Sequence, residues 1–511
     1  MTSLSHDNPG SPLAEDRDRL WFAELGEHWA RWLPLGALLL FALGASAPLA
    51  DMDLPMHLAT GAWIVRHHTV PFVEPFSWTR SGAAYYSYSW LPQLIYYLLY
   101  ANIGPVALRV LHGLTFMAGG ASLFWLARVA GWRPWTALYL NFLSLLPVVL
   151  IAAYLRPQAL LFPLVILAWG AGLRILDSDR PARWVAALAL VASAAANSHL
   201  LFPVTALPGA IALTRTPTPW KRGILIAAAL LGGWVFSPYG LHWPSVFQLY
   251  FRHIALLDFP PRIQEIIPGF LFARVSPICM ILVAVLSAIP WVQRDTDTTV
   301  RQRIVFGLLW FAGMFGFGLA GRALMVWWFA ALPALVRLIE RAPRPPAGVQ
   351  RRMALSVMAS LPLVMSVGLA WHTGAPDTDL SSPARRSVDP LAAWLEVHVR
   401  PAGRPKVLTA FNYGSYLTWR LPEYSMSIDG RSIFPDSAAR PDAYRVADDG
   451  PLPFGPWQSA DLAIVPLTYP VAAVLDSARE WKRVDTVPAD SSERLGTGLW
   501  VKRTWIDRFR R

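Results

Sequence analysis

The sequence predicts a polytopic α-helical membrane protein that ends in a small α/β domain outside the membrane. Hydrophobic residues make up 54% of the chain and charged residues only 15%, whereas soluble proteins carry roughly a quarter charged residues. The apolar residues occur in long runs separated by short polar segments, as expected of a chain that crosses a bilayer repeatedly. After about residue 380 the runs give way to short strand-like segments.

A membrane-spanning helix needs about 20 largely apolar residues, and about eleven runs meet or approach this length. The predicted spans are 33–50, 105–127, 135–153, 157–173, 184–197, 200–214, 223–237, 276–291, 304–320, 323–337 and 353–371. Two further segments, 54–68 and 89–101, are predicted to be helices too short to cross. The second is rich in aromatic residues, which favours a helix lying at the membrane interface.

The distribution of Lys and Arg predicts which side each loop faces, because short cytoplasmic loops retain positive charge. With the N-terminus inside, every inside loop is basic, for example at 128–133, 174–183 and 337–352. The short outside loops carry only Arg156 and Arg322. The chain is therefore expected to have a cytoplasmic N-terminus and a C-terminal domain on the outer side of the membrane.

Four regions follow from this layout. The expected order is a cytoplasmic segment 1–32, a transmembrane domain 33–371 whose first outer loop is 51–104, a linker 372–390 and a periplasmic α/β domain 391–511. The N-terminal segment is polar, unlike a signal peptide, so the first span is expected to remain as an anchor. Strands are predicted in "RPKVLTAFNYGSYLTWRL", "EYSMSIDGRSIF" and "ADLAIVPL".

Composition also excludes several classes. The single cysteine, Cys279, excludes a disulfide within the chain and a zinc site built on cysteines. The net charge of +12 is explained by cytoplasmic arginines that face anionic lipid. Because no nucleic-acid-binding motif is present, nucleic acid is not an expected partner.

Polar side chains at the predicted membrane edges gather on the outer side. They are Asp51, Asp53, His57, Glu74, Arg156, Gln158, Asn197, His199, Tyr239, Glu265 and Arg322. Ionisable groups at such positions are costly and usually functional. The sequence therefore predicts one outward-facing polar cavity walled by apolar helices.

These segments resemble, in the same order, the motifs of bacterial GT-C-fold integral membrane glycosyltransferases. The resemblance rests on "DMDLPMHLATGAWIVRHHTVPFVEPFSWT", "SYSWLPQLIYYLLY", "RPQ", "ANSH", "SPYG", the Glu of "IQE", Arg322 and "YGSYLTWRL…SIDGR", and it covers most of residues 45–435. Glu74 stands where the family pattern usually has Asp, and Ser198 and Leu200 flank His199 where a bulky apolar residue and Gly are usual.

The resemblance implies an enzyme that moves a sugar from a polyprenyl-phosphate donor to an extracytoplasmic glycan, lipid or protein. It also implies a location in the bacterial inner membrane, with the C-terminal domain in the periplasm. Because the tail of such a donor is long and apolar, its phosphate lies at membrane depth. Arg322 and Arg156 are the candidates to bind it, since a guanidinium makes bidentate phosphate contacts. Asp53 is the first candidate for the base that deprotonates the acceptor and Asp51 the second. Direct displacement with one base would invert the anomeric centre.

The other outer residues have less specific predicted roles. His57 is grouped with the two aspartates as a catalytic candidate. Candidates to bind the acceptor or the sugar are Glu74, Gln158, Asn197, His199, Tyr239 and Glu265. The cofactor is left open: Asp51, Asp53 and His57 have a spacing that permits a divalent metal.

Each candidate also has a structural explanation. Asp53 could serve only as the N-cap of the helix that follows it. His57 could be a buried structural histidine, and Arg156 a residue that extends toward the interface from a helix start. Asn197 and His199 could cap a helix turn.

Two other classes of function are weighed against the enzyme. A transporter or flippase for an anionic lipid-linked sugar would place polar groups near the bilayer midplane and show internal repeats, and neither is seen in the sequence. A structural assembly protein would not need acids, arginines and a histidine at successive outer turns. The enzyme is therefore favoured, with a membrane lipid-linked donor and an extracytoplasmic acceptor as its partners.

Overall fold

The computed structural model describes residues 33–46, 49, 53–152, 155–212, 214, 220–255, 299–319, 324–341, 383–399, 403–431, 456–488 and 496–509. Three predicted site residues, Asp51, Glu265 and Arg322, lie outside these ranges, as do the predicted spans 276–291 and 353–371.

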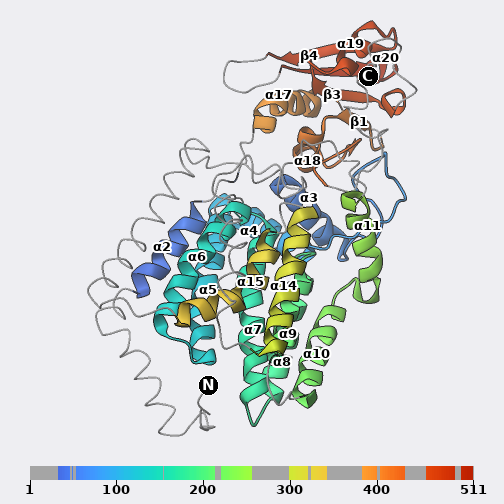
Figure 1. Ribbon diagram of the computed structural model, residues 1–511. Helices are drawn as coiled ribbons and strands as arrows, with labels where there is room; N and C mark the ends of the chain where they lie inside the picture. Colours follow the sequence, from blue (N-terminus) through green and yellow to red (C-terminus); the bar gives the residue numbers. More distant parts are fainter. Residues whose placement is uncertain are drawn as a thin grey trace.

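A bundle of helices forms the larger part of the molecule (Figure 1). Its longer members are α2 (Leu33–Ala45), α5 (Pro105–Ala130), α6 (Pro134–Ala152), α7 (Leu161–Asp177), α8 (Ala182–Ala196), α10 (Trp220–Val235), α14 (Val300–Leu319) and α15 (Leu324–Arg341). Each coincides with a predicted span. The predicted span 200–214 is not one continuous helix, because a 3₁₀ turn, η2 (Phe202–Ala206), precedes the short α9 (Leu207–Ala212).

Two described helices are long and apolar enough to cross a membrane, Pro105–Ala130 and Pro157–Asp177. A third is added if Trp220–Val235 and Gly240–Tyr250, bent by 96° at their junction, form one span. Other apolar helices, such as Ala182–Ala196, are shorter. The membrane character of the chain is confirmed, and the number of about eleven spans stays a prediction.

The ends of α5 follow from residues at its two termini. Pro105 occupies the first turn, where a missing N–H costs nothing. Gly131 ends the helix in the left-handed conformation at φ 69°, and its N–H bonds back to the last turn. Within the helix, a Cβ on Gly113 would lie 2.7 Å from the carbonyl oxygen of Phe41. Helices α2 and α5 therefore pack backbone to backbone.

The first outer loop contains the two predicted short helices, α3 (Leu54–His67) and α4 (Trp90–Asn102). Pro55 begins α3 in the first turn. The two helices approach closely, because a Cβ on Gly61 would lie 2.2 Å from the carbonyl oxygen of Gln93. Later in the chain, η3 (Gly240–His242) and α11 (Trp243–Ala255) follow α10.

The C-terminal domain is a five-stranded mixed sheet with helices on both faces, as predicted in outline. Its elements are α17 (Pro383–His398), β1 (Lys406–Thr409), α18 (Phe411–Arg420), β2 (Ser425–Met426), η8 (Pro456–Ser459), β3 (Leu462–Pro466), α19 (Pro470–Ser477), β4 (Trp481–Val487), β5 (Thr497–Lys502) and α20 (Arg503–Phe509). The strand order is β2-β1-β3-β5-β4. Strand β1 runs parallel to β2 and β3, whereas β5 runs antiparallel to β3 and β4.

Two sequence expectations for this region were wrong in detail. The stretch from Phe411 to Arg420 was expected to be strand-like, but it forms α18. Tyr413, Tyr416 and Leu417 are buried, and this helical spacing places them on one face against the sheet and α17. In addition, α17 begins at Pro383, inside the segment 372–390 that was expected to be a linker.

The first outer loop extends the sheet of the C-terminal domain. Met426 of β2 donates its N–H to Phe76 O (3.2 Å), and Trp78 donates its N–H to Met426 O (3.1 Å). Ser77 and Met426 pair in the parallel sense. The Trp78 indole also donates to Val407 O of β1 (3.2 Å). Backbone pairing thus joins the membrane part of the chain to its C-terminal domain.

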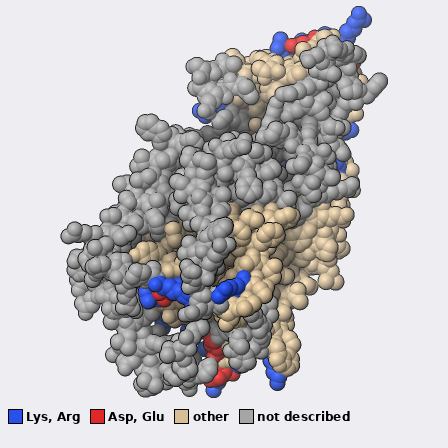
Figure 2. Space-filling view, in the orientation of Figure 1, with Lys and Arg blue, Asp and Glu red and all other residues tan. Residues whose placement is uncertain are grey.

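The bundle has one end near the C-terminal domain and one far from it, and the assignment of these ends to the two sides of the membrane stays a prediction. At the end near the C-terminal domain, Leu91 of α4 donates its N–H to Asn197 O, so two predicted outer segments meet. At the far end, Glu340 of α15 accepts a hydrogen bond from Arg133 N (2.9 Å), which joins two predicted cytoplasmic loops. Figure 2 shows blue and red side chains at that far end and on the C-terminal domain, with a mostly uncharged described surface between them.

Candidate active site

Asp53 lies at the end of the bundle next to the C-terminal domain, at the N-cap position of α3. Its carboxylate makes no capping hydrogen bond to the helix, although a capping Asp normally accepts one from the second or third residue. The side chain is 40% exposed, and Oδ2 lies 3.7 Å from Nη2 of Arg156. A capping role alone therefore does not account for Asp53.

Arg156 approaches Asp53 from the turn between α6 and α7. Its backbone is extended (φ −120°, ψ 144°) at the start of η1 (Pro157–Leu160), because the residue before a proline is pushed out of the helical region. The side chain is only 14% exposed. Gln158, two residues on, is buried. The structure thus brings together a predicted base and a predicted phosphate-binding arginine.

His57 lies one turn after Asp53 on α3 and faces α4. Its Nδ1 is 3.0 Å from Nε2 of Gln93. The Gln93 side-chain oxygen in turn accepts a hydrogen bond from the hydroxyl of Ser87. Because an amide N–H₂ only donates, Nδ1 acts as the acceptor and the proton of the neutral ring resides on Nε2. The imidazole is held in one orientation beside Asp53.

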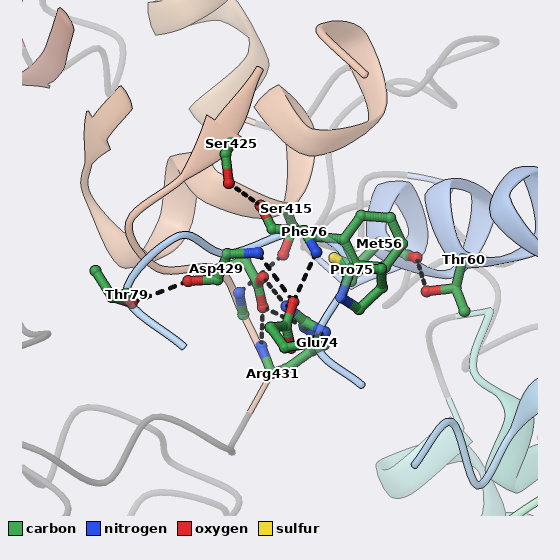
Figure 3. A network of polar contacts seen from close by, with 12 residues as sticks. Met56, Thr60, Glu74, Pro75, Phe76, Thr79, Ser415, Ser425, Asp429 and Arg431 are labelled. Carbon is green, nitrogen blue, oxygen red and sulfur yellow. Dashed lines mark hydrogen bonds and ion pairs between the residues drawn. The ribbon is translucent and has the colours of Figure 1, made fainter. Parts of the chain in front are cut away.

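Glu74 is fully buried and bonds to Arg431 of the C-terminal domain (Figure 3). Arg431 Nη1 donates to Oε2 (2.9 Å) and Nη2 donates to Oε1 (2.8 Å). Oε1 also accepts the backbone N–H groups of Phe76 and Ser77. This carboxylate was expected to contact the acceptor or the sugar, and that contact stays a prediction.

Asp429 is the second carboxylate on Arg431. The arginine donates from Nε to Oδ1 (2.8 Å) and from Nη2 to Oδ2 (2.6 Å). Burial raises the pKa of Asp429, and Arg431 opposes that shift. Burial alone would lower the pKa of Arg431, but the two carboxylates raise it well above its ordinary value. The guanidinium is therefore permanently charged in this site.

Tyr239 is fully buried beneath the outer loop. Its hydroxyl oxygen accepts the N–H of Ser87 (2.6 Å) and donates to Pro71 O (3.4 Å). Burial raises the pKa of Tyr239 well above its ordinary value, so the hydroxyl stays protonated. In this arrangement Tyr239 supports the loop, and its predicted contact with sugar stays a prediction.

Asn197 and His199 follow α8, as predicted, and both are buried. The Asn197 amide accepts from the indole of Trp90 (2.7 Å) and donates to Ser193 O and Phe236 O. It therefore ties α4, α8 and the end of α10 together. His199 Nδ1 accepts the N–H of Leu201 (3.2 Å). These contacts fit the capping explanation, and binding to sugar stays untested.

Among the described residues, no group of three His, Cys, Asp or Glu side chains is close enough to hold a metal ion. The predicted metal ligands include Asp51, which lies beyond those residues. Asp53 and His57 are near each other, but Nδ1 of His57 faces Gln93.

Sequence reasoning missed the role of Arg431 and Asp429. The "SIDGR" motif was noticed, but Asp429-Gly-Arg431 has the composition of an ordinary turn. The pairing of Glu74 with a residue so distant in the chain depends on the docking of two separate segments. The available signals were a Glu among mostly apolar residues of the first outer loop and the SIDGR motif itself.

No protein-family model and no curated protein sequence matches the chain. Solved structures share its fold. ArnT from Cupriavidus metallidurans bound to undecaprenyl phosphate aligns over 93% of this chain and 98% of its own, with a TM-score of 0.57 and 12% identity. The apo form of the same protein aligns over 95% of this chain and 98% of its own, with a TM-score of 0.54 and 14% identity.

The apo oligosaccharyltransferase from Archaeoglobus fulgidus also aligns, over 80% of this chain and 65% of its own, with a TM-score of 0.54 and 10% identity. The alignments cover between 80% and 95% of this chain. The resemblance predicted from the ordered motifs is thereby confirmed at the level of the fold: the chain has the architecture of the GT-C membrane glycosyltransferases.

Proposed function

We propose that the protein is a membrane glycosyltransferase that moves a sugar from a polyprenyl-phosphate donor to an acceptor outside the cytoplasm. The observation that carries the proposal is the pair formed by Asp53 and Arg156. A partly exposed carboxylate that makes no capping hydrogen bond faces a mostly buried guanidinium at one end of an apolar bundle. This is the combination that deprotonates a hydroxyl and stabilises a departing phosphate.

In the proposed reaction the acceptor hydroxyl oxygen attacks the anomeric carbon of the donor sugar. The bond between that carbon and the phosphate oxygen breaks, and the polyprenyl phosphate leaves with both electrons. Asp53 takes the hydroxyl proton, so the new glycosidic bond is neutral. Arg156, joined by Arg322 in the sequence-based proposal, stabilises the negative charge of the leaving phosphate. One displacement inverts the configuration at the anomeric carbon.

The spacing of Asp53 and Arg156 suits such a cycle. At 3.7 Å the two charges attract but do not form a tight hydrogen bond. A donor phosphate would compete for the guanidinium, which can make bidentate contacts to phosphate. Arrival of the donor would then loosen the hold of Arg156 on the carboxylate and free Asp53 to accept a proton.

The proposed donor class draws on the similar solved structure that contains undecaprenyl phosphate. The proposed location is the bacterial inner membrane, with the site on the periplasmic side. It rests on the basic loops at one end of the bundle and the polar site at the other. The alternative, a flippase for a lipid-linked sugar, shares the ligand but breaks no glycosidic phosphate bond.

A reconstitution assay tests the proposal. The purified protein in liposomes receives polyprenyl-phosphate sugars bearing radiolabelled sugar, together with an envelope extract as the acceptor. Transfer is expected with the wild type and lost with Asp53→Asn, while Asp179→Asn, at an exposed carboxylate beyond α7, behaves like the wild type. Movement of the intact donor between leaflets without release of polyprenyl phosphate would overturn the proposal in favour of a flippase.

A further inference from the structure

The C-terminal domain holds the first outer loop through one buried ionic cluster. We call Glu74, Asp429 and Arg431 the outer clasp. Arg431 makes four side-chain hydrogen bonds to the two carboxylates, which are both fully buried. Its guanidinium also lies over the rings of Phe76 (5.2 Å) and Tyr85 (4.6 Å). A charge so enclosed is stabilised only while both partners stay in place.

The clasp sits at the seam where the outer loop joins the sheet. Next to it, Ser425 Oγ donates to Phe76 O (2.9 Å) and Ser77 Oγ donates to Ser427 O (3.0 Å). Figure 3 shows Glu74 and Arg431 meeting between the loop and the strand that leads to Asp429. Loss of the clasp would remove four ionic hydrogen bonds from this seam, which is otherwise held by backbone pairs and by hydrogen bonds from the side chains of Ser77, Trp78, Thr79 and Ser425.

The same turn touches the candidate base. Gly430 lies between Asp429 and Arg431, and a Cβ placed on it would be 2.9 Å from Oδ1 of Asp53 and 2.8 Å from Oγ of Ser415. The N–H of Gly430 donates to that Ser415 oxygen (2.9 Å). One face of the turn therefore binds Glu74, and its glycine abuts the Asp53 carboxylate.

We propose that the outer clasp is a positioning device, through which the C-terminal domain places the turn at Gly430 against Asp53 and so completes the active site. This deepens the proposed function, because it assumes that Asp53 is the base. Glu74, Asp429 and Arg431 touch neither donor nor acceptor. They act by fixing the wall beside the carboxylate, and Glu74 is thereby assigned to positioning instead of sugar binding.

The first experiment measures how readily the seam opens, from the rate of thiol labelling, and needs no transferase assay. Ser77, buried at the seam, is replaced by cysteine in a Cys279→Ser background, which removes the only native thiol. Maleimide labelling of Cys introduced by Ser77→Cys is then compared with and without Arg431→Met. We expect labelling at least about tenfold faster in Arg431→Met, because opening of the seam limits access to the thiol.

Arg420→Met is the matched control. Arg420 also binds two carboxylates, Asp389 and Glu396, but all three lie within the C-terminal domain. Labelling in this control should equal that of the parent. If Arg431→Met labels no faster than Arg420→Met, the clasp does not hold the seam, and the proposal is overturned whatever the transferase assay shows.

The second experiment tests positioning. Gly430→Ala adds one methyl group toward Asp53 without removing any ionic contact, so it is expected to fold. We expect kcat to fall at least about tenfold, as displacement of a reacting group does, with the KM for the donor unchanged. Arg431→Lys should lower kcat in the same way but less than Arg431→Met. Gly232→Ala, on an exposed face of α10 with no described atom within 4 Å of the added Cβ, should match the wild type.

The outcomes separate the two proposals. A normal kcat in Gly430→Ala and Arg431→Lys, with an active wild type, overturns positioning. A fall in the amount of folded protein with unchanged kcat per folded molecule does so too, since it shows a structural role alone. If the wild type transfers no sugar while labelling responds to Arg431→Met, the proposed function is wrong and so is the positioning of Asp53. The clasp would then only hold the outer loop to the C-terminal domain.

Discussion

Arg156 and Asp53 face each other at the end of the helical bundle next to the C-terminal domain, with Nη2 and Oδ2 3.7 Å apart. Arg156 is held by a turn whose extended backbone is imposed by Pro157. Asp53 lies at the start of α3, and its carboxylate makes no capping hydrogen bond to the helix. Two rigid helix starts thus fix the charges while leaving the carboxylate 40% exposed, which is the arrangement that a base accessible to an incoming hydroxyl requires.

Replacement of Asp53 by Asn is expected to lower the rate of sugar transfer by about 10²–10⁴-fold, the range for loss of a general base. The protein should fold normally, because the side chain makes no capping bond. Initial rates in liposomes, divided by the amount of monodisperse protein, provide the measurement. A rate within about twofold of the wild type would remove Asp53 from the proposed mechanism.

Replacement of Arg156 should act mainly on the donor. Arg156→Lys keeps the charge but loses the planar fork, and Arg156→Ala loses both. A charged hydrogen bond contributes about 1.5–3 kcal/mol, so the KM for the donor should rise about tenfold to a hundredfold in Arg156→Ala and less in Arg156→Lys. Arg180→Ala, at the opposite end of the bundle, is the control. An unchanged KM with a lowered kcat would instead assign Arg156 to the leaving group alone.

The bundle was predictable from sequence because spans and loops leave local signals. Pro105 and Gly131 delimit α5, and Pro55 begins α3, all readable from residue type. The prediction of one continuous helix over 200–214 was wrong, because an apolar run does not reveal that Pro203 lies in a 3₁₀ turn. In the C-terminal domain the helix α18 was missed because aromatic residues favour strands on average, and their burial depends on packing against the sheet and α17.

The site was predictable only in part, for a similar reason. The proximity of Asp53 and Arg156 followed from assigning both to the outer side. The environment of Glu74 could not be predicted in this way, because its partner Arg431 lies 357 residues later in the chain, in the C-terminal domain. The ordered motifs indicated which residues matter, whereas the pairing of distant segments decided which carboxylate stays exposed and which is buried.

Tyr239→Phe should affect stability more than catalysis. The hydroxyl oxygen is the acceptor for the buried N–H of Ser87, and loss of a buried partner costs about 1–3 kcal/mol. The free energy of unfolding should fall by that amount, with kcat nearly unchanged, because a tyrosine whose pKa is raised by burial does not act as a base. Thermal unfolding and initial rates on the same preparation measure both. Lost activity with unchanged stability would contradict this prediction and would support the role of Tyr239 in sugar binding.

Asp429 gives the clasp a pH dependence. Burial raises its pKa above the ordinary value of 3.8, although Arg431 opposes the shift. A carboxyl group with a higher pKa in the folded state binds its proton more tightly there than in the unfolded chain. Its contribution to the free energy of unfolding is therefore complete below pH 3.8, and it is lost as the pH rises through the folded-state pKa.

Asp429→Asn, which carries no charge at any pH, isolates this contribution because all other titrating groups are shared with the wild type. The difference in unfolding temperature, wild type minus variant, should be largest in acid and should decline as the pH rises toward neutrality. Circular dichroism melts of both proteins in the same detergent and buffer series measure it. A difference that grows with pH would show that attraction to Arg431 outweighs burial, and that the pKa of Asp429 is lowered in the folded protein.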